Sequence, residues 1–573
     1  MSWFIGYTGI NNPVLNEYIS SLNLIQKEEI NNPNLHLFYT RKKNNLMLNI
    51  KTASGGWIIS GIPVSAGSDN LKFMQTDDWE PILSAGELNI KKINGHFTGM
   101  IWDNETFTFF NDPLGLRDVY FLKVNSNYFF STRPGWIAKF NAENKINISE
   151  FSTNWNLPHQ ISWGSILNNI MMLNPGGIIK IKSGVIEKSN SPWMPDFSRV
   201  INSEEFIDAL NNFIRLPSFE NKKINLGLSG GIDSRVLLQI LFNNKIDSFG
   251  SHTFGSSFTA DGKIAEKIVN NYELEHRFFP VSFPDSEELL KYLYDSISQL
   301  GLSASIYEIL NYPFYEQLGN EEYIIIDGAY GEIFRRAYLN RFLILGKNAL
   351  LNKDAESIFR LLRRSKSDIF NNELIKQIEI SAVDRISDIL QILPDADSIG
   401  IENWLDTFFI KTKVANISGP SQTLLDGTCR AFMPFIQPFI LDKGFGLDFS
   451  EKKNGKLFWR IINQGKELNR YPLVKDQIIY PFSSNLLLAR LYQKFKRKVG
   501  LIHKDNYQHE LLMRLKEFVL DRVNSQEVKN FDFYDYKKVS NLVADFYNGN
   551  TSMINSVTWW ITFDIWRECC KIK

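Results

Sequence analysis

Residues 226–238 read LGLSGGIDSRVLL, in which the hexamer SGGIDS separates an apolar run from a stretch with helical spacing. The same succession of apolar run, polar turn and amphipathic stretch recurs as far as residue 329. Strands that alternate with helices of this length form a parallel sheet with helices on both faces. The pattern therefore predicts an α/β domain whose first strand ends at the hexamer.

The first 190 residues have a different pattern. Short runs of alternating apolar residues, such as 56–64 and 107–112, are separated by Gly, Pro, Asn and Asp. Such runs predict β-strands with few helices between them. The pattern changes after 191–198, a stretch with two prolines and no periodicity, which is typical of a linker.

The chain of 573 residues is too long for one hydrophobic core. Beyond residue 350 its apolar residues follow mainly helical spacing. We expect two domains, residues 1–195 and residues 200–573, with the parallel sheet early in the second domain and helices at its end.

Charge and cysteine content exclude several classes of protein. Lys+Arg and Asp+Glu both number 63, so the formal net charge is zero and no basic surface for nucleic acid is expected. No apolar stretch of about 18 residues is present, so we expect no membrane span. The start lacks the pattern of a signal peptide. Three cysteines make no disulfide framework and favour a reducing compartment, so a cytoplasmic protein is expected.

The hexamer has the chemistry of a phosphate site. In open parallel sheets, ligands lie outside the carboxyl ends of the strands. Gly230 and Gly231 let the backbone approach a ligand, and amides at a helix N-terminus point at anionic oxygens, with Ser229 and Ser234 adding hydroxyls. A carboxylate beside phosphate is repulsive without a cation between them, so Asp233 implies Mg²⁺. The segment predicts a cradle for a phosphate chain that carries magnesium.

Two other interpretations of the hexamer are weaker. It is not a Walker loop, because no Gly-Lys-Ser/Thr follows it. A glycine-rich turn without function would leave Asp233 and both serines unexplained.

The hexamer resembles the pyrophosphate-binding loop of the ATP pyrophosphatase superfamily. By their order and spacing, further stretches resemble the asparagine synthetase-like branch of that superfamily. They are residues 95–121, 130–140, 171–181, 324–338 and 429–440. The resemblance covers most of the chain to about residue 480, and only the hexamer is highly specific.

The resemblance implies a fold and a set of nucleotide contacts. The implied fold is α/β and multi-domain: an N-terminal Ntn-hydrolase-like αββα glutaminase-type domain, then a PP-loop α/β synthetase domain with a parallel sheet and a helical C-terminal part. The implied cofactors are ATP and Mg²⁺. The implied cofactor-binding residues are Leu228, Ser229, Gly230, Gly231, Asp233, Ser234, Arg235, Thr253, Phe254 and Gly328. For Arg235, a solvent-facing position in the first turn of the helix is an equal alternative to a phosphate contact.

The glutaminase chemistry of the family is expected to be lost. Ser2 stands where the family has a nucleophilic cysteine, and bulky Trp3 and Phe4 follow it. The stretch 55–64, GGWIISGIPV, stands in place of an Asn-Gly-Glu segment that binds glutamine. A terminal serine is a nucleophile in related amidohydrolases, so Ser2 alone does not decide the question. Without glutaminase chemistry, the amine would come from a source other than glutamine.

The second loop of the family is degraded here. Aligning Glu332 and Phe334 with its Glu-Leu-Phe end puts Gly331 where the family has a magnesium-binding Asp. A shift of one residue would instead give that role to Glu332, and Asp327 is a further alternative. We predict Asp233 and Glu332 as the metal ligands.

A lysine completes the predicted catalytic set of Asp233, Glu332 and Lys475. Lys475 lies in a segment similar to the one that bears a pyrophosphate-contacting lysine, with a surface lysine as the alternative. The catalytic glutamate of asparagine synthetases has no clear counterpart, which argues against aspartate as the substrate.

The chain is similar to the members of the family that lack glutaminase activity, β-lactam synthetase and the lasso-peptide macrolactam synthetases. This similarity implies an ATP-dependent ligase that adenylates a carboxylate, releases pyrophosphate and couples the acyl group to an amine, preferably in macrolactam formation. The implied partners are a peptide or small-molecule carboxylate substrate, with a leader-binding protein and a leader peptidase if the product is a lasso peptide. The alternatives are an asparagine synthetase-type amidotransferase that uses free ammonia, or a catalytically idle scaffold.

Overall fold

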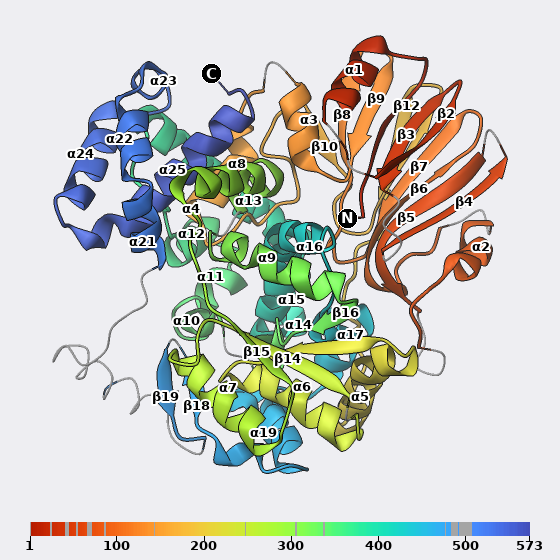
Figure 1. The fold of residues 1–573 in the computed structure, drawn as a ribbon, viewed down its shortest axis with the longest axis vertical. Helices are drawn as coiled ribbons and strands as arrows, with labels where there is room; N and C mark the ends of the chain where they lie inside the picture. Colours follow the sequence, from red (N-terminus) through yellow and green to blue (C-terminus); the bar gives the residue numbers. More distant parts are fainter. Residues whose placement is uncertain are drawn as a thin grey trace.

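The computed structural model describes residues 2–22, 24, 26–40, 45–52, 55–65, 71–84, 88–141, 144–246, 248–303, 306–335, 338–475, 477–482, 491 and 507–572. It has an antiparallel β-sandwich, a parallel α/β unit and a large helical region (Figure 1). The predicted α/β fold class, with antiparallel sheets first, a parallel sheet second and helices at the C-terminal end, is confirmed.

The N-terminal sandwich has two six-stranded sheets. The first has the order β10 (Ile170–Met172), β8 (Tyr120–Val124), β9 (Asn127–Ser131), β1 (Phe4–Thr8), β3 (Leu35–Thr40) and β2 (Lys27–Asn32). The second has the order β12 (Val185–Asn190), β11 (Gly177–Lys182), β7 (Thr106–Asn111), β6 (Asn94–Trp102), β5 (Gly55–Val64) and β4 (Leu46–Thr52).

The period-two alternation of the strands builds the layers. Tyr128 and Phe130 of β9 point into the sandwich core, whereas Phe129 between them packs with the helices outside. Helices α1 (Pro13–Ser21) and α3 (Pro134–Phe140) cover the outer face of the first sheet, and α2 (Thr76–Ser84) covers that of the second. The result is an αββα arrangement. The predicted linker lies between β12 and α5 (Ser203–Phe219).

The parallel sheet has the order β15 (His276–Phe279), β14 (Phe249–Phe254), β13 (Lys223–Gly227), β16 (Tyr323–Ile326) and β17 (Arg430–Phe432). Every neighbouring pair is parallel. Alternation along β16 shows that both faces are covered: Ile324 and Ile326 pack with α5, α6 (Ile232–Asn243) and α7 (Ala260–Asn271), and Ile325 packs against α9 (Ile306–Asn320). From β13 the chain adds β14 and then β15 on one side of the sheet, and it then adds β16 and β17 on the other side of β13. The strand order therefore reverses between β13 and β16.

The remaining helices lie before, between and after the strands of the parallel sheet in the chain. They are α4 (Ile148–Asn156), α8 (Ser286–Leu300), α10 (Asn340–Leu345), α11 (Lys347–Leu351), α12 (Ala355–Leu362), α13 (Asn372–Ile392), α14 (Ala396–Ile399), α15 (Ile401–Lys413), α16 (Gly419–Leu425), α17 (Pro438–Gly446), α18 (Phe449–Lys452), α19 (Lys456–Asn463), α21 (Tyr507–Arg514), α22 (Lys516–Asn524), α23 (Gln526–Lys529), α24 (Tyr536–Tyr547) and α25 (Ile554–Cys569). A short hairpin of β18 (Leu473–Lys475) and β19 (Ile478–Tyr480) lies beside α7 (Figure 1).

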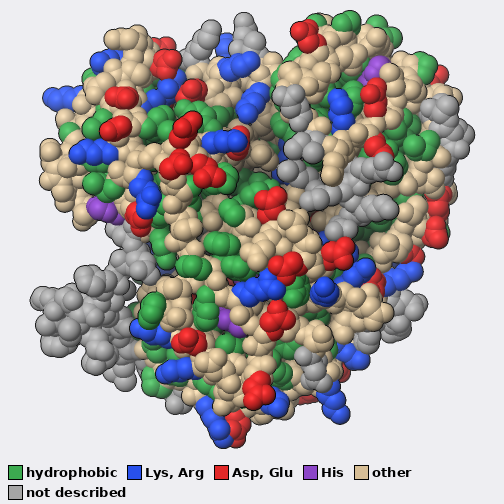
Figure 2. All heavy atoms as spheres, viewed as in Figure 1, with side chains coloured by type: hydrophobic (Ala, Val, Ile, Leu, Met, Phe, Trp, Pro, Cys, Tyr) green, Lys and Arg blue, Asp and Glu red, His purple; other side chains and the backbone are tan. Residues whose placement is uncertain are grey.

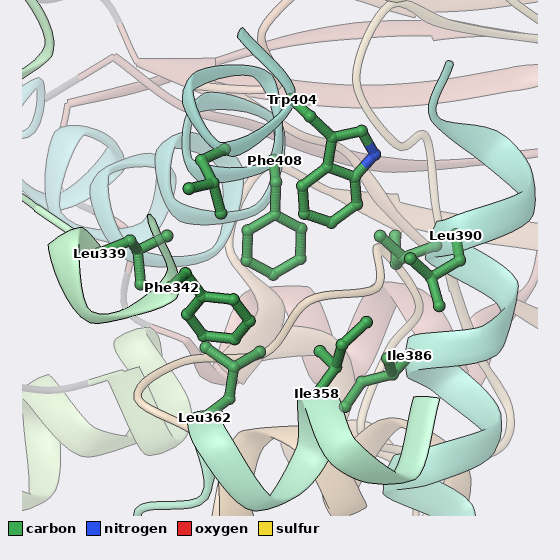
Figure 3. Close-up of a pocket in the computed structure, with 10 residues that line it drawn as sticks. Leu339, Phe342, Ile358, Leu362, Ile386, Leu390, Trp404 and Phe408 are labelled. Carbon is green, nitrogen blue, oxygen red and sulfur yellow. The ribbon is translucent and has the colours of Figure 1, made fainter. Parts of the chain in front are cut away.

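One pocket of the helical region is a packing void. Side chains from α12, α13 and α15, among them Ile358, Leu390 and Trp404, surround a wholly apolar space of about 10 Å³ (Figure 3). An apolar cavity of this size is too small for a ligand and stays dry. The helices pack here around a hydrophobic core, not around a ligand site.

Two further observations concern surface charge and membrane crossing. Acidic and basic side chains are intermixed over the face in Figure 2, as the zero net charge suggests. Within the described ranges, none of the helices combines the length and hydropathy that crossing a bilayer requires.

Candidate functional site

The candidate site lies where the strand order reverses, at the carboxyl ends of β13 and β16. The hexamer follows β13 and leads into α6, and the loop from Asp327 to Arg335 follows β16. A Cβ at Gly328 would lie 2.8 Å from the Ser234 amide nitrogen, and one at Gly331 would lie 2.6 Å from Asp233 Cγ. Glycine at both positions therefore lets the second loop lie directly on the hexamer.

Three amides of the hexamer are bonded within the protein. The Ser229 amide donates to Ser234 Oγ over 3.1 Å, and the Gly231 amide donates to Ser229 Oγ over 3.2 Å. The Gly230 amide donates to Asp261 Oδ1 over 2.8 Å. Asp261 lies in the first turn of α7, and burial raises its pKa. These bonds hold the hexamer in a defined shape before any ligand binds.

The anion-binding groups are then the first amides of α6. The helix begins at Ile232 after Gly231, which makes no side-chain cap. The amides of its first turn have no acceptor inside the helix, and the helix dipole adds positive potential there. An exposed end of this kind binds phosphate or carboxylate oxygens.

Asp233, the second residue of α6, forms a two-pronged ion pair with Arg335. Arg335 Nε donates to Asp233 Oδ1 and Arg335 Nη2 donates to Asp233 Oδ2, both over 2.7 Å. The side chains are 20% and 23% exposed. Burial and the charge of Glu332 raise the pKa of Asp233, while Arg335 and Lys475 oppose that rise. The predicted catalytic residues Asp233, Glu332 and Lys475 thus lie within electrostatic range of one another.

Glu332 pairs with a cation that the sequence did not indicate. Lys413 Nζ donates to Glu332 Oε1 over 3.0 Å and lies over the rings of Tyr330 and Phe409. Tyr330 has a φ of 69°, a left-handed conformation that is uncommon for a bulky residue and turns the loop back onto α6. Lys413 is the last residue of α15, so the helical region contributes a cation to the site.

Asp233 and Glu332 do not fit a magnesium ion as the predicted pair. Both Asp233 oxygens are taken by Arg335, and Glu332 is paired with Lys413. Among the described residues no group of three or more His, Cys, Asp or Glu is placed to hold a metal. In the described part of the chain, Asp327 has no cationic partner: it accepts the Ala329 amide over 2.8 Å, and burial raises its pKa. Asp327, the predicted alternative, is therefore a candidate to hold a cation.

Arg235 is bonded to carbonyls of the protein, and its predicted phosphate contact stays a prediction. It is 0% exposed, so the solvent-facing alternative is wrong. Its Nη1 donates to the carbonyls of Leu468 and Tyr471, and its Nη2 donates to those of Gly230 and Pro472. These carbonyls compete with a phosphate for the same donors. Arg235 therefore ties the hexamer to the segment before β18.

That tie positions Lys475. The Val474 amide donates to the Gly230 carbonyl over 2.9 Å, and a Cβ at Gly230 would lie 2.3 Å from the Val474 side chain. Hairpin and hexamer are thus in direct contact. Lys475, at the end of β18, belongs to the electrostatic surroundings of Asp233. Its predicted contact with pyrophosphate stays a prediction.

The remaining predicted nucleotide contacts lie at the same sheet edge. Leu228 is buried, and its carbonyl accepts Thr253 Oγ1 over 2.6 Å, which joins β14 to the hexamer. Phe254, at the end of β14, packs against Phe279 and Tyr315. The structure places Leu228, Thr253 and Phe254 beside the cradle, and their contact with the nucleotide stays a prediction.

Ser2 lies in a buried polar cluster of the sandwich. It is 2% exposed, and its Oγ lies 3.0 Å from Ser60 Oγ. Arg117 Nη2 donates to Ser60 Oγ over 2.8 Å, and the Ser2 amide donates to the Asp426 carbonyl. The Ser2 hydroxyl is therefore buried and bonded to a second hydroxyl. A cavity of about 210 Å³ lies beside it, also lined by Asn45 and Asp426.

Besides Lys413, three side chains of these clusters were not indicated by the sequence. Asp261 lies in an amphipathic helix without a motif of its own. Arg335 follows the Glu-Ile-Phe segment of the second loop, where no motif marks it. Asp426 lies just after α16 in a stretch without a motif.

Comparison with known proteins yields likenesses of fold only. No family model and no curated protein matches the sequence. One similar solved structure is the allosteric regulatory enzyme of purine biosynthesis, with 10% identity over 50% of this chain and 82% of that chain and a TM-score of 0.23. Glutamine phosphoribosylpyrophosphate amidotransferase from B. subtilis has 11% identity over 49% and 83%, with a TM-score of 0.22. NH3-dependent NAD synthetase from Campylobacter jejuni has 15% identity over 34% and 98%, with a TM-score of 0.20. At these values the likenesses carry no argument about activity.

Proposed function

We propose that the protein is an ATP-dependent amide ligase that forms an acyl-adenylate and releases pyrophosphate. The observation that carries the proposal is the open N-terminus of α6 at the switch point of the sheet, with Asp233 and Arg335 beside it. Polyphosphate binding is the chemistry that suits such a helix end. The hexamer, its contact with the second loop and the nearby Lys475 support the same conclusion.

The reaction has two steps. A carboxylate oxygen of the substrate attacks the α-phosphorus of ATP, the bond to the β-phosphate oxygen breaks, and pyrophosphate leaves. An amine nitrogen then attacks the acyl carbon, AMP leaves, and the amine loses a proton. The α6 amides and the cations around Asp233 hold the departing phosphates, so that catalysis comes from positioning and charge stabilisation.

The amine belongs to the substrate in this proposal, and the product is a lactam, preferably a macrolactam of the lasso-peptide type. Ser2 supports this choice, because its side chain is buried and bonded to Ser60, whereas a nucleophile must reach the glutamine amide. Magnesium would enter with the nucleotide, and Asp327 would hold it. A peptide carboxylate substrate, a leader-binding protein and a leader peptidase remain part of the proposal.

The test is ATP–pyrophosphate exchange with purified protein, against amino acids, β-amino acids and a precursor peptide with an internal Asp or Glu. Exchange with one substrate, lost in Asp233→Asn and kept in the matched variant Asp208→Asn at an exposed position of α5, would establish adenylation. Exchange with aspartate alone, followed by asparagine formation from ammonia, would favour the amidotransferase. Absence of both exchange and Mg-ATP binding would leave a scaffold.

A further inference from the structure

We propose that Arg335 is a phosphate-binding residue of the cradle and that Asp233 positions it. This inference rests on the proposed function and deepens it. It assigns to a guanidinium the positive charge that the sequence assigned to a metal held by Asp233.

The geometry of the guanidinium supports the assignment. Arginine presents five N–H donors in a planar fork. Its Nε and Nη2 face Asp233, and within the described structure Nη1 donates to no acceptor. A carboxylate on one edge leaves the Nη1/Nη2 edge available for a second oxyanion, which is the bidentate arrangement that phosphate favours.

The guanidinium is held at the cradle and stays accessible. Asp233 is in the first turn of α6, so a side chain bonded to both of its oxygens lies beside the anion-binding amides. Gly331 leaves the space for this contact, because a Cβ there would lie 2.7 Å from Asp233 Oδ1. The Arg335 side chain is 23% exposed, which lets a ligand reach it.

The charge balance beside the hexamer favours a permanent cation. Asp261 accepts the Gly230 amide, and Asp233 and Asp327 lie at the ends of the two neighbouring loops. A polyphosphate adds further negative charge to this poorly solvated space. Lys413 and Arg335 are each paired with a carboxylate, but the Nη1/Nη2 edge of Arg335 is left for a second oxyanion. Arg335 keeps its charge at all working pH values, so it offsets the ligand where a lysine could lose its proton.

The experiment measures binding by isothermal titration calorimetry with three probes: ATP, inorganic pyrophosphate and adenosine. The variants are Arg335→Met, Arg335→Lys, Asp233→Asn and the double variant, with Arg360→Met as matched control, since Arg360 is exposed and makes an ion pair within α12. Thermal unfolding of each variant verifies that it is folded. The magnesium concentration is varied in each series.

Arg335→Met is expected to weaken ATP and pyrophosphate binding about tenfold or more, the effect of one charge-assisted contact. Adenosine binding should be unchanged, and Arg335→Lys should recover part of the loss. Asp233→Asn should weaken the same two ligands, and the double variant should be no weaker than Arg335→Met alone, since both act through one group. The magnesium concentration for half-saturation should be unchanged in Asp233→Asn.

Two results would overturn the inference. One is unchanged ATP and pyrophosphate binding in folded Arg335→Met. The other is an increased magnesium requirement in Asp233→Asn but not in Arg335→Met, because that outcome makes Asp233 a metal ligand. Failure of the wild-type protein to bind ATP at all would refute the proposed function itself and is distinguished by the first titration.

Discussion

Arg117 and Asp426 form an ion pair in which neither side chain is exposed to solvent. Arg117 belongs to the turn between β7 and β8 of the sandwich, and Asp426 follows α16, which precedes the last strand of the parallel sheet. His96 Nε2 lies 3.1 Å from the same carboxylate. Burial raises the pKa of Asp426, but His96 and Arg117 outweigh it and leave the pKa below its ordinary value. The two units are therefore joined by a buried charge network.

The substitution Asp426→Asn should lower the free energy of unfolding at pH 7 by about 3–5 kcal/mol, because it leaves Arg117 buried without a counter-charge. A carboxyl whose pKa is lower in the folded than in the unfolded chain stabilises the folded state at pH values above its unfolded pKa. This stabilisation is lost as the pH falls through the folded pKa. The difference from wild type should therefore be full above about pH 5 and shrink below about pH 4. Urea unfolding at several pH values measures it; a difference that grew in acid would contradict this account.

Arg235→Met should destabilise the cradle by about 2–4 kcal/mol, because carbonyls at 230, 468, 471 and 472 lose a buried charged donor. Hydrogen exchange should increase in the hexamer and in β18, while the sandwich keeps its protection. Arg360→Met at an exposed site is the control. Local protection equal to that of wild type would show that the tie is dispensable.

Gly331→Ala should weaken ATP binding about tenfold with little loss of thermal stability, because the new Cβ would push Asp233 from its place. Gly227→Ala is the matched control, since its Cβ would meet nothing closer than 3.5 Å. Titration calorimetry on both variants separates the effects. Equal affinities in the two would show that the second loop yields without disturbing Asp233.

Neither the wild-type protein nor Ser2→Cys should release glutamate from glutamine, because the side chain at position 2 is buried and faces Ser60. A coupled glutamate dehydrogenase assay measures the product. Release by the wild type that Ser2→Ala abolishes would show that the sandwich has a hydrolytic site, and ammonia would then be the amine.

Local pattern accounts for what could be predicted. The α/β class followed from alternation, because each strand and helix carries its own period and its own turn residues. SGGIDS could be placed at a strand end and a helix start for the same reason, and β13 and α6 confirm it. Glu332 and Lys475 were brought into the site by resemblance, and the structure places both in the electrostatic surroundings of Asp233.

The sequence by itself determined the elements, their order and the chemistry of the hexamer, since those depend on residues a few positions apart. Only the tertiary structure decided which charges meet. Arg335 reaches Asp233, Lys413 reaches Glu332, and Arg235 turns inward to carbonyls near residue 470. Such pairings depend on how distant segments pack across one sheet edge, where a Cβ at Gly331 would clash with the Asp233 carboxylate.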